Sequence, residues 1–191
     1  MHGAVLAVAA AVLLQGPGSA ASLRARRADT PPAIDGHLDD AVWRSADVGD
    51  TFRQYEPEEG QPATERTELR ILYDNSALYV GVRLFDREPG KIVARLSRRD
   101  DSPDADRFTF YVDALHDRLT GASFEVSAGG VQRDTIISND TNRDSSWDGV
   151  WESAVSIDRE GWTIEMRIPL SQLRFLRGDR QTWGFNAERF I

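Results

Sequence analysis

Apolar and polar residues alternate with a period of two through most of the chain after residue 66. Every second position of one such run is aliphatic: Leu78, Val80, Val82 and Leu84. Tyr79, Gly81 and Arg83 lie between them. This alternation is typical of β-strands that bury one face. It predicts strands over residues 67–73, 78–85, 108–112, 124–126, 131–137, 151–157, 162–168 and 182–191.

Short turn sequences separate these runs. Asp74-Asn75-Ser76, Gly129-Gly130 and Asp158-Arg159-Glu160-Gly161 each favour a tight reversal, so three antiparallel hairpins are expected. Pro169 ends one strand, and 170–173 is expected to form a single helical turn. Many short strands with frequent turns indicate an all-β fold, an antiparallel β-sandwich with little helix.

The segment from Pro32 to Trp43 has a different pattern. Two prolines hold the chain extended, and Asp35-Gly36 is a turn pair. Asp39 is expected to N-cap a short helix whose Trp43 points inward. The segment therefore predicts a strand, a turn and a short helix that packs on the core.

The first 21 residues have the features of a signal peptide. An apolar run over 4–14 is followed by the small residues Ser19, Ala20 and Ala21, and the run is too short to span a bilayer. The usual basic residues are missing from Met1-His2-Gly3. Export to the periplasm, the cell surface or the outer membrane is expected, with 22–191 as one mature domain.

Composition narrows the range of partners. The formal net charge is −8 and acidic residues are spread throughout, which disfavours nucleic acid and anionic membranes. The chain has no cysteine, which fits a bacterial exported protein better than a eukaryotic one. Because an apolar strand closes the sequence, we expect the domain to be truncated at its C-terminus and to belong to a longer protein.

Several motifs, taken in order, resemble the family 9 carbohydrate-binding modules. They are Ile34-Asp35-Gly36-x-Leu38-Asp39-Asp40-x-x-Trp43, Leu72-Tyr73-Asp74-Asn75-x-x-Leu78-Tyr79-Val80, Asp106-Arg107-Phe108-x-Phe110-Tyr111-Val112-Asp113, Gly161-Trp162-Thr163-Ile164-Glu165-Met166-x-Ile168-Pro169 and Gly184-Phe185-Asn186. The resemblance covers about residues 28 to 191 and implies a β-sandwich that binds a polysaccharide or oligosaccharide.

One group of proteins within that family resembles this sequence more closely than the others do. Arg98-Arg99-Asp100, Gly130-Val131-Gln132-Arg133-Asp134 and Trp147-Asp148-x-Val150-Trp151 resemble large bacterial surface proteins. In those proteins the module precedes an outer-membrane β-barrel. The resemblance thus implies a C-terminal barrel as a possible partner domain.

The resemblance also implies a sugar clamp of two tryptophans. The first would lie in the loop 101–105, which has no aromatic residue here, and the second would lie beyond Ile191. Trp147, in a loop rich in Asn, Asp and Arg, is either a substitute sugar platform or an anchor for that loop, and the anchor is the more common case. Trp43, Trp162 and Trp183 are expected in the core, and Trp151 could be either.

Arginine and aspartate neighbours define the rest of the candidate site. Arg99, Arg133 and Asp134 could chelate sugar hydroxyls, or could form structural ion pairs, which are more frequent. With Trp147 they are the predicted carbohydrate-binding residues.

Acidic loops raise two further readings. Asp104 and Asp106 lie in an aspartate-rich loop that could hold calcium, although a solvated acidic loop is commoner. No catalytic constellation stands out among the 31 acidic residues, so a hydrolase role follows only by association with the family.

Two functions therefore remain open. The first is an exported, non-catalytic carbohydrate-binding domain of a longer surface or glycan-processing protein. The second is a structural or interaction domain of an outer-membrane β-barrel protein that has lost the sugar clamp. The missing aromatic residue in the loop 101–105 keeps both open.

Overall fold

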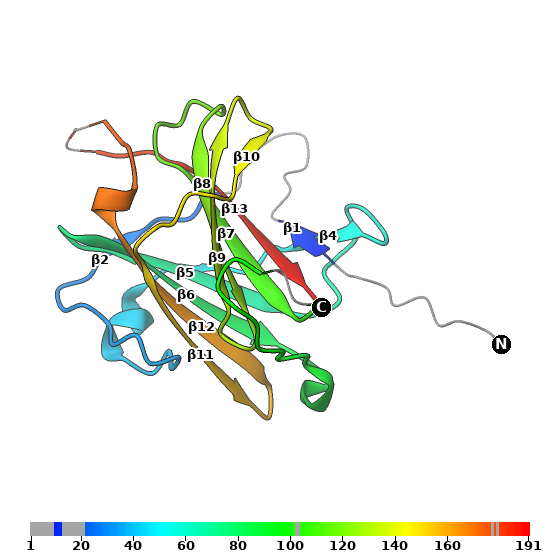
Figure 1. Cartoon of the computed structure of the whole chain (residues 1–191). Helices are drawn as coiled ribbons and strands as arrows, with labels where there is room; N and C mark the ends of the chain where they lie inside the picture. Colours follow the sequence, from blue (N-terminus) through cyan, green and yellow to red (C-terminus); the bar gives the residue numbers. More distant parts are fainter. Residues whose placement is uncertain (1–9, 13–21, 102–103, 177, 179) are drawn as a thin grey trace.

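Two mainly antiparallel sheets pack face to face and form a β-sandwich (Figure 1). This computed structural model describes residues 10–12, 22–101, 104–176, 178 and 180–191. Within those residues the only helices are three short 3-10 turns, and no helix is long and apolar enough to cross a membrane. The all-β sandwich predicted from the alternation is confirmed.

The seven-stranded sheet has the order β10-β9-β8-β7-β13-β1-β4. Its strands in chain order are β1 (Ala10–Val12), β4 (Arg53–Glu56), β7 (Arg107–Asp113), β8 (Gly121–Ser127), β9 (Gln132–Ser138), β10 (Asn142–Asp144) and β13 (Gly184–Phe190). Every pairing in this sheet is antiparallel.

The six-stranded sheet has the order β11-β12-β6-β5-β2, and β3 also pairs with β5. Its strands are β2 (Arg26–Arg27), β3 (Val48–Gly49), β5 (Thr67–Tyr73), β6 (Ala77–Phe85), β11 (Glu152–Asp158) and β12 (Gly161–Pro169). The short β2 is the one strand in this sheet that pairs in parallel, with β5.

The three predicted hairpins are confirmed as β5–β6, β8–β9 and β11–β12. The helical turn after Pro169 is η3 (Leu170–Gln172), and η2 (Pro89–Lys91) lies in the connection between the sheets. Several strands are longer than expected, because backbone pairing continues past the last apolar residue.

The main core lies between the two sheets. The inward side chains of β6 and β12, which include Val80, Val82, Trp162 and Ile164, are buried against Phe108 and other residues of the seven-stranded sheet. Trp162 and Trp151 are buried, while Trp183 is partly buried and contacts Phe175 with ring centroids 5.3 Å apart. The expected core positions of Trp162 and Trp183 are therefore largely confirmed.

A smaller core covers the outer face of the six-stranded sheet. We call residues 33–46 the N-terminal unit. Trp43, on η1 (Ala41–Ser45), is 1% exposed and packs over Gly81, where an added Cβ would come within 2.8 Å of Leu38 and of the Trp43 ring. The inward position of Trp43 is confirmed.

The capping prediction for this unit was wrong. The residue before η1 is Asp40, not Asp39, and its side chain makes no cap hydrogen bond. Instead Asp40 Oδ2 accepts a hydrogen bond from the backbone N–H of Ala33 at 2.8 Å. The carboxylate therefore closes the turn that precedes the helix.

The predicted signal peptide lies mainly outside the described residues. Its residues 10–12 are described, and they form β1 within the seven-stranded sheet.

Candidate functional site

Three of the four predicted binding residues meet at one place, around Asp134. This β9 side chain is fully buried, and its carboxylate accepts hydrogen bonds from Arg99 Nη2 at 2.5 Å, Gly149 N at 2.6 Å and Trp151 Nε1 at 3.0 Å. We call Asp134 with these three donors the Asp134 cluster. Because Arg99 lies in one loop and Gly149 and Trp151 lie in another, the carboxylate ties two loops to the sheet.

Arg99 is the partly exposed member of that cluster. Its guanidinium also donates to Gln132 Oε1 at 2.9 Å and to Gly149 O at 2.7 Å, and it lies 3.2 Å from Asp148. A group with this many fixed partners has little capacity left for a ligand. This geometry matches the structural ion pair that was one of the two expectations for Arg99 and Asp134.

Trp147 lies beside the same cluster but packs into the protein. Its ring meets Phe124 edge-on with centroids 5.9 Å apart and joins the main core as a partly buried residue. Gly149 passes directly under the ring, where a Cβ would lie 2.7 Å from it. These contacts favour the loop-anchor interpretation over an open sugar platform.

Arg133 does not join the other three residues. It is the next residue on β9, so its side chain lies on the opposite face of the sheet from Asp134, level with Glu125 on β8. The sequence could not separate the two positions, because it did not show which face of β9 would be covered.

Asp104 and Asp106 are also separated. Asp104 is exposed and pairs with Arg95 at 3.2 Å, whereas Asp106 is buried and accepts from Val93 N at 2.7 Å. Burial raises the pKa of Asp106. Among the described residues no group of three His, Cys, Asp or Glu side chains could hold a metal ion, so calcium at Asp104 and Asp106 stays a prediction.

Arg133 belongs to a polar surface on the outside of the seven-stranded sheet. We call this surface the polar face. It consists of outward side chains at matching positions of five neighbouring strands. They are Arg107, Thr109, Tyr111, Ser123, Glu125, Arg133, Thr135, Arg143, Asn186, Glu188 and Phe190.

Glu125 lies at the centre of one half of the polar face. Thr109 Oγ1 donates to its carboxylate at 3.1 Å, and Arg107 Nε lies 3.6 Å from the same oxygen. The Arg107 guanidinium in turn lies 3.9 Å from the centre of the Phe190 ring. Arg133 is half-buried beside Glu125, and among the described residues no hydrogen-bond or ion-pair partner satisfies its guanidinium.

Tyr111 lies at the centre of the other half. Its hydroxyl donates to Glu188 Oε2 at 2.9 Å, and the Arg143 guanidinium lies 5.5 Å from its ring centre. Burial, and then the nearby Glu188 carboxylate, raise the pKa of Tyr111, so the hydroxyl stays protonated and remains a donor. The face therefore offers planar donors, carboxylate acceptors and aromatic rings side by side.

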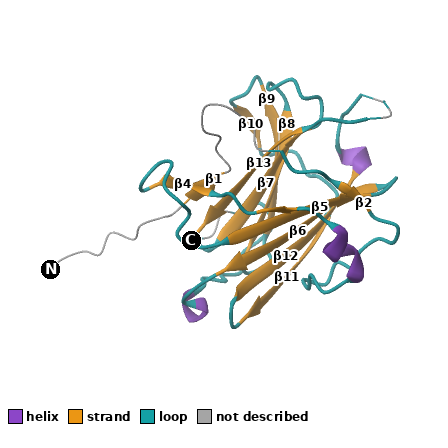
Figure 2. Cartoon of the chain, turned by 180° about the vertical axis from the view of Figure 1, so that it is seen from behind, coloured by secondary structure: helices purple, strands orange, loops and turns teal. Residues whose placement is uncertain are grey.

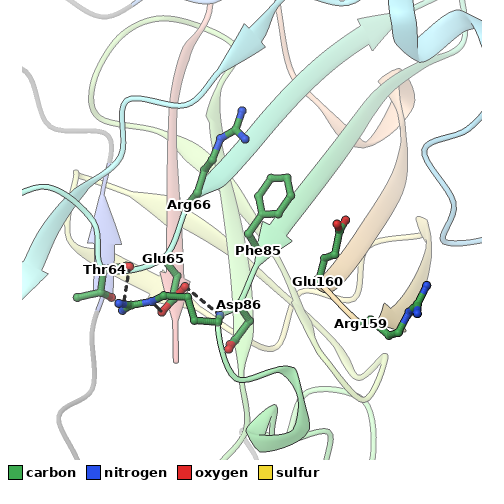
Figure 3. Close-up of a pocket in the computed structure, with 8 residues that line it drawn as sticks. Thr64, Glu65, Arg66, Phe85, Asp86, Arg159 and Glu160 are labelled. Atoms are coloured by element: carbon green, nitrogen blue, oxygen red, sulfur yellow. Dashed lines mark hydrogen bonds and ion pairs between the residues drawn. The ribbon is translucent and has the colours of Figure 1, made fainter.

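A hollow lies at the end of the six-stranded sheet (Figure 3). It is open, has a volume of about 520 Å³, and is lined by charged residues together with Thr64 and Phe85. Most of these charges have ion-pair partners: Arg87 binds Glu65 at 2.8 Å, Arg189 lies 3.6 Å from Asp86, and Arg83 lies 3.4 Å from Glu160. The hollow presents few unpaired groups.

The sequence did not single out most of the polar face. From the sequence, Tyr111, Glu125, Glu188 and Phe190 are only positions in predicted strands, and Arg107 lies just before one. The available signal was the polar half of the alternation in 107–113, 121–127 and 184–190. That signal marks any solvated strand face, so only the pairing of the strands could gather these residues.

The fold and the polar face together define the class of protein. It is a β-sandwich in which polar side chains gather on the outer face of one sheet. The chain belongs to the carbohydrate family 9 binding domain-like family, whose model matches residues 34–190. The resemblance inferred from the motifs is confirmed. No curated protein matches the chain.

Solved structures share the fold. A family 9 carbohydrate-binding module from Caldicellulosiruptor kristjanssonii, in complex with cellotriose, has a TM-score of 0.56 and 17% identity over 87% of this chain and 83% of that one. The same kind of module in complex with glucose has a TM-score of 0.55 at 17% identity, covering 86% of this chain and 85% of that chain. A candidate carbohydrate-binding protein from Bacteroides uniformis has a TM-score of 0.66 at 13% identity, covering 86% and 81%.

Proposed function

We propose that this chain is an exported, non-catalytic saccharide-binding domain of a longer surface or glycan-processing protein. We propose further that it holds its ligand on the polar face. The family is one of carbohydrate-binding domains, and two structural neighbours carry cellotriose and glucose. The ligand class is therefore a neutral polysaccharide or oligosaccharide.

One observation carries the choice of surface. Within the part of the chain that the structure describes, the Arg133 guanidinium has no hydrogen-bond or ion-pair partner, and it lies beside a carboxylate, Glu125, that Thr109 and Arg107 already orient. A guanidinium and a carboxylate held side by side can bind vicinal hydroxyl groups from both sides, as donor and acceptor. Phe190 adds an aromatic ring on which the C–H groups of a sugar could rest.

The Asp134 cluster is a less suitable place for a saccharide than the polar face. Its carboxylate is fully buried and its donors are all engaged. Binding a sugar there would require breaking a buried ion pair, which costs several kcal/mol.

The proposed function is tested by affinity electrophoresis and calorimetry on the full chain. Glucose, cellotriose and a panel of neutral polysaccharides serve as probes. We expect at least one polysaccharide to retard the chain, and Arg133→Ala and Glu125→Gln to weaken binding by about 1–3 kcal/mol, the cost of leaving a polar partner unpaired. Arg174→Ala, an exposed arginine off the polar face, is the matched control.

Two outcomes would contradict the proposal. If Trp147→Ala abolishes binding and Arg133→Ala does not, the ligand lies at the Asp134 cluster instead. If no saccharide binds, the second candidate function is favoured, that of a structural or interaction domain of an outer-membrane β-barrel protein. The absence of an aromatic residue from the loop 101–105 favours that candidate.

A further inference from the structure

The seven-stranded sheet contains a slot one strand wide between β4 and β13, and β1 fills it (Figure 2). β1 pairs antiparallel with β13 at Glu188 and Arg189, and with β4 at Arg53, Gln54 and Glu56. Neighbouring strands lie about 4.8 Å apart, so β4 and β13 are about 10 Å apart across β1. That spacing admits one extended chain.

Each wall of the slot has contacts that do not involve β1. β13 pairs with β7 along its whole length, from Gly184 to Phe190. On the other wall Phe52, just before β4, is 4% exposed in the core, and Gln54 makes hydrogen bonds to Gln61 O at 2.8 Å and to Pro62 O at 2.9 Å. The two walls should therefore persist if β1 leaves.

β1 is held in the slot by main-chain pairing, with Ala11 opposite Arg189 and Val12 opposite Glu188. Backbone N–H and C=O groups on a strand edge are a template for another strand. The edges of β13 and β4 would offer such groups to another segment once β1 is removed.

The present occupant lies in the segment that the sequence predicts to be removed on export. We propose that removal of this leader opens the slot, and that an extended, apolar, proline-free segment of a partner polypeptide then adds to it, antiparallel to β13. The proposal rests on the export part of the proposed function. Its occupant follows from the pairing: Ala10–Val12, a short apolar segment in extended form, is seated there through its backbone.

The recognition would be of the β-strand addition type. In this mode main-chain hydrogen bonds on the edges supply the affinity, and a proline within the added strand removes a donor from the ladder. The strand would be held on both sides, by β4 and by β13, so both edges of the added segment are satisfied. This two-sided pairing distinguishes the slot from the single free edges at β10 and β11.

The first experiment opens the slot in the folded protein. A site-specific protease sequence is placed within residues 13–21 of the full chain, and a fluorescein-labelled peptide of residues 7–14, flanked by lysines, is the probe. We expect no binding before cleavage and saturable one-to-one binding after it, measured by fluorescence anisotropy. The same peptide carrying Ala11→Pro should bind at least roughly tenfold more weakly.

Three results would overturn the proposal. They are equal binding before and after cleavage, no binding after cleavage, and dimerisation of the cleaved chain without peptide binding, which would mean that a second copy fills the slot. Saccharide binding is measured separately on the cleaved chain by electrophoresis, so failure of the slot and failure of the polar face are distinguishable.

A second experiment needs no cleavage. Ala11→Pro in the full chain should speed amide hydrogen exchange in β4 and β13, because the strand between them loses its pairing. Exchange in the β5–β6 hairpin is the internal control and should not change. Unchanged exchange in all four strands would show that residues 10–12 do not hold the slot, and the proposal would fail.

Discussion

Two buried carboxylates fix distant segments to the two sheets, and each does so by collecting three N–H donors. Glu165 on the six-stranded sheet accepts from Asp35 N at 2.9 Å, Gly36 N at 2.9 Å and Trp43 Nε1 at 2.7 Å. The Asp134 cluster on the seven-stranded sheet also combines a backbone N–H and an indole N–H. Its third donor is a guanidinium, that of Arg99.

The difference between the two sites is the counter-charge. Asp134 has Arg99 as an ion-pair partner, whereas among the described residues Glu165 has no cation paired with it. Burial raises the pKa of Glu165, against the lowering effect of its three donors. Glu165 thus holds the N-terminal unit through neutral donors, while Asp134 holds its loops through neutral donors and an ion pair. The same arrangement, a buried carboxylate that accepts three N–H donors, therefore occurs both in the N-terminal family motif and at the predicted binding site.

The largest effect is expected at the ion-paired site. Asp134→Ala would leave the Arg99 guanidinium, the Gly149 N–H and the Trp151 indole without their acceptor. We expect the free energy of unfolding to fall by about 3–5 kcal/mol, the usual cost of breaking a buried ion pair. Chemical denaturation measures this, with Asp104→Ala, an exposed aspartate, as the control. A loss below about 1 kcal/mol would mean that the loops are held by packing alone.

A smaller effect is expected at the neutral site. Glu165→Gln keeps the shape but turns an NH₂ group toward N–H donors, so we expect a loss of about 1–3 kcal/mol. Glu152→Gln on the neighbouring strand β11, where the carboxylate is exposed, is the matched control. If Glu165→Gln costs more than Asp134→Ala, the counter-charge is not what separates the two sites.

The pH dependence of the Glu165 variant follows from its raised pKa. The stability linked to this group is complete below the ordinary value of 4.5 and is lost as the pH rises through the raised folded-state pKa. The gap in unfolding free energy between the wild type and Glu165→Gln should therefore be wider at pH 4 than at pH 8. A gap that grows with pH would show that Glu165 is better stabilised as a carboxylate in the folded state.

The smallest effect is expected at Asp74, a partly exposed carboxylate that also accepts several hydrogen bonds. Burial alone would raise the pKa of Asp74, but hydrogen bonds from Ser76, Tyr79 and Ala77 lower it from 3.8 to about 2. This group therefore stabilises the fold above pH 3.8, and the gain is lost as the pH falls through about 2. We expect Asp74→Asn to cost about 1 kcal/mol at pH 7, because solvent screens the site, and nearly nothing at pH 2. Urea denaturation at several pH values checks this, and a cost that does not change with pH would contradict it.

The strands and hairpins could be predicted from the sequence because the two-residue alternation reports one buried face directly. The same signal does not show that Glu165 is buried. The alternation places Glu165 on the face opposite Trp162 and Ile164, but the N-terminal unit covers that face and Glu165 is fully buried. Local pattern cannot show that a segment 130 residues away will pack there.

The candidate site was harder to predict for a related reason. Arg133 and Asp134 are adjacent in sequence, but they lie on opposite faces of β9, and only the register with β8 separates their roles. The polar face exists because five strands align their outward residues, a property that no single segment carries.

The tie between Gly36 and Glu165 also sets an order for folding. Gly36 has φ +88°, and a Cβ there would lie 2.7 Å from the backbone of Val155, so the turn fits only against a finished β11–β12 hairpin. Its partner is synthesised 129 residues later. The N-terminal unit therefore cannot dock until nearly the whole domain has been translated, and its docking is a late step of a slow, long-range folding reaction.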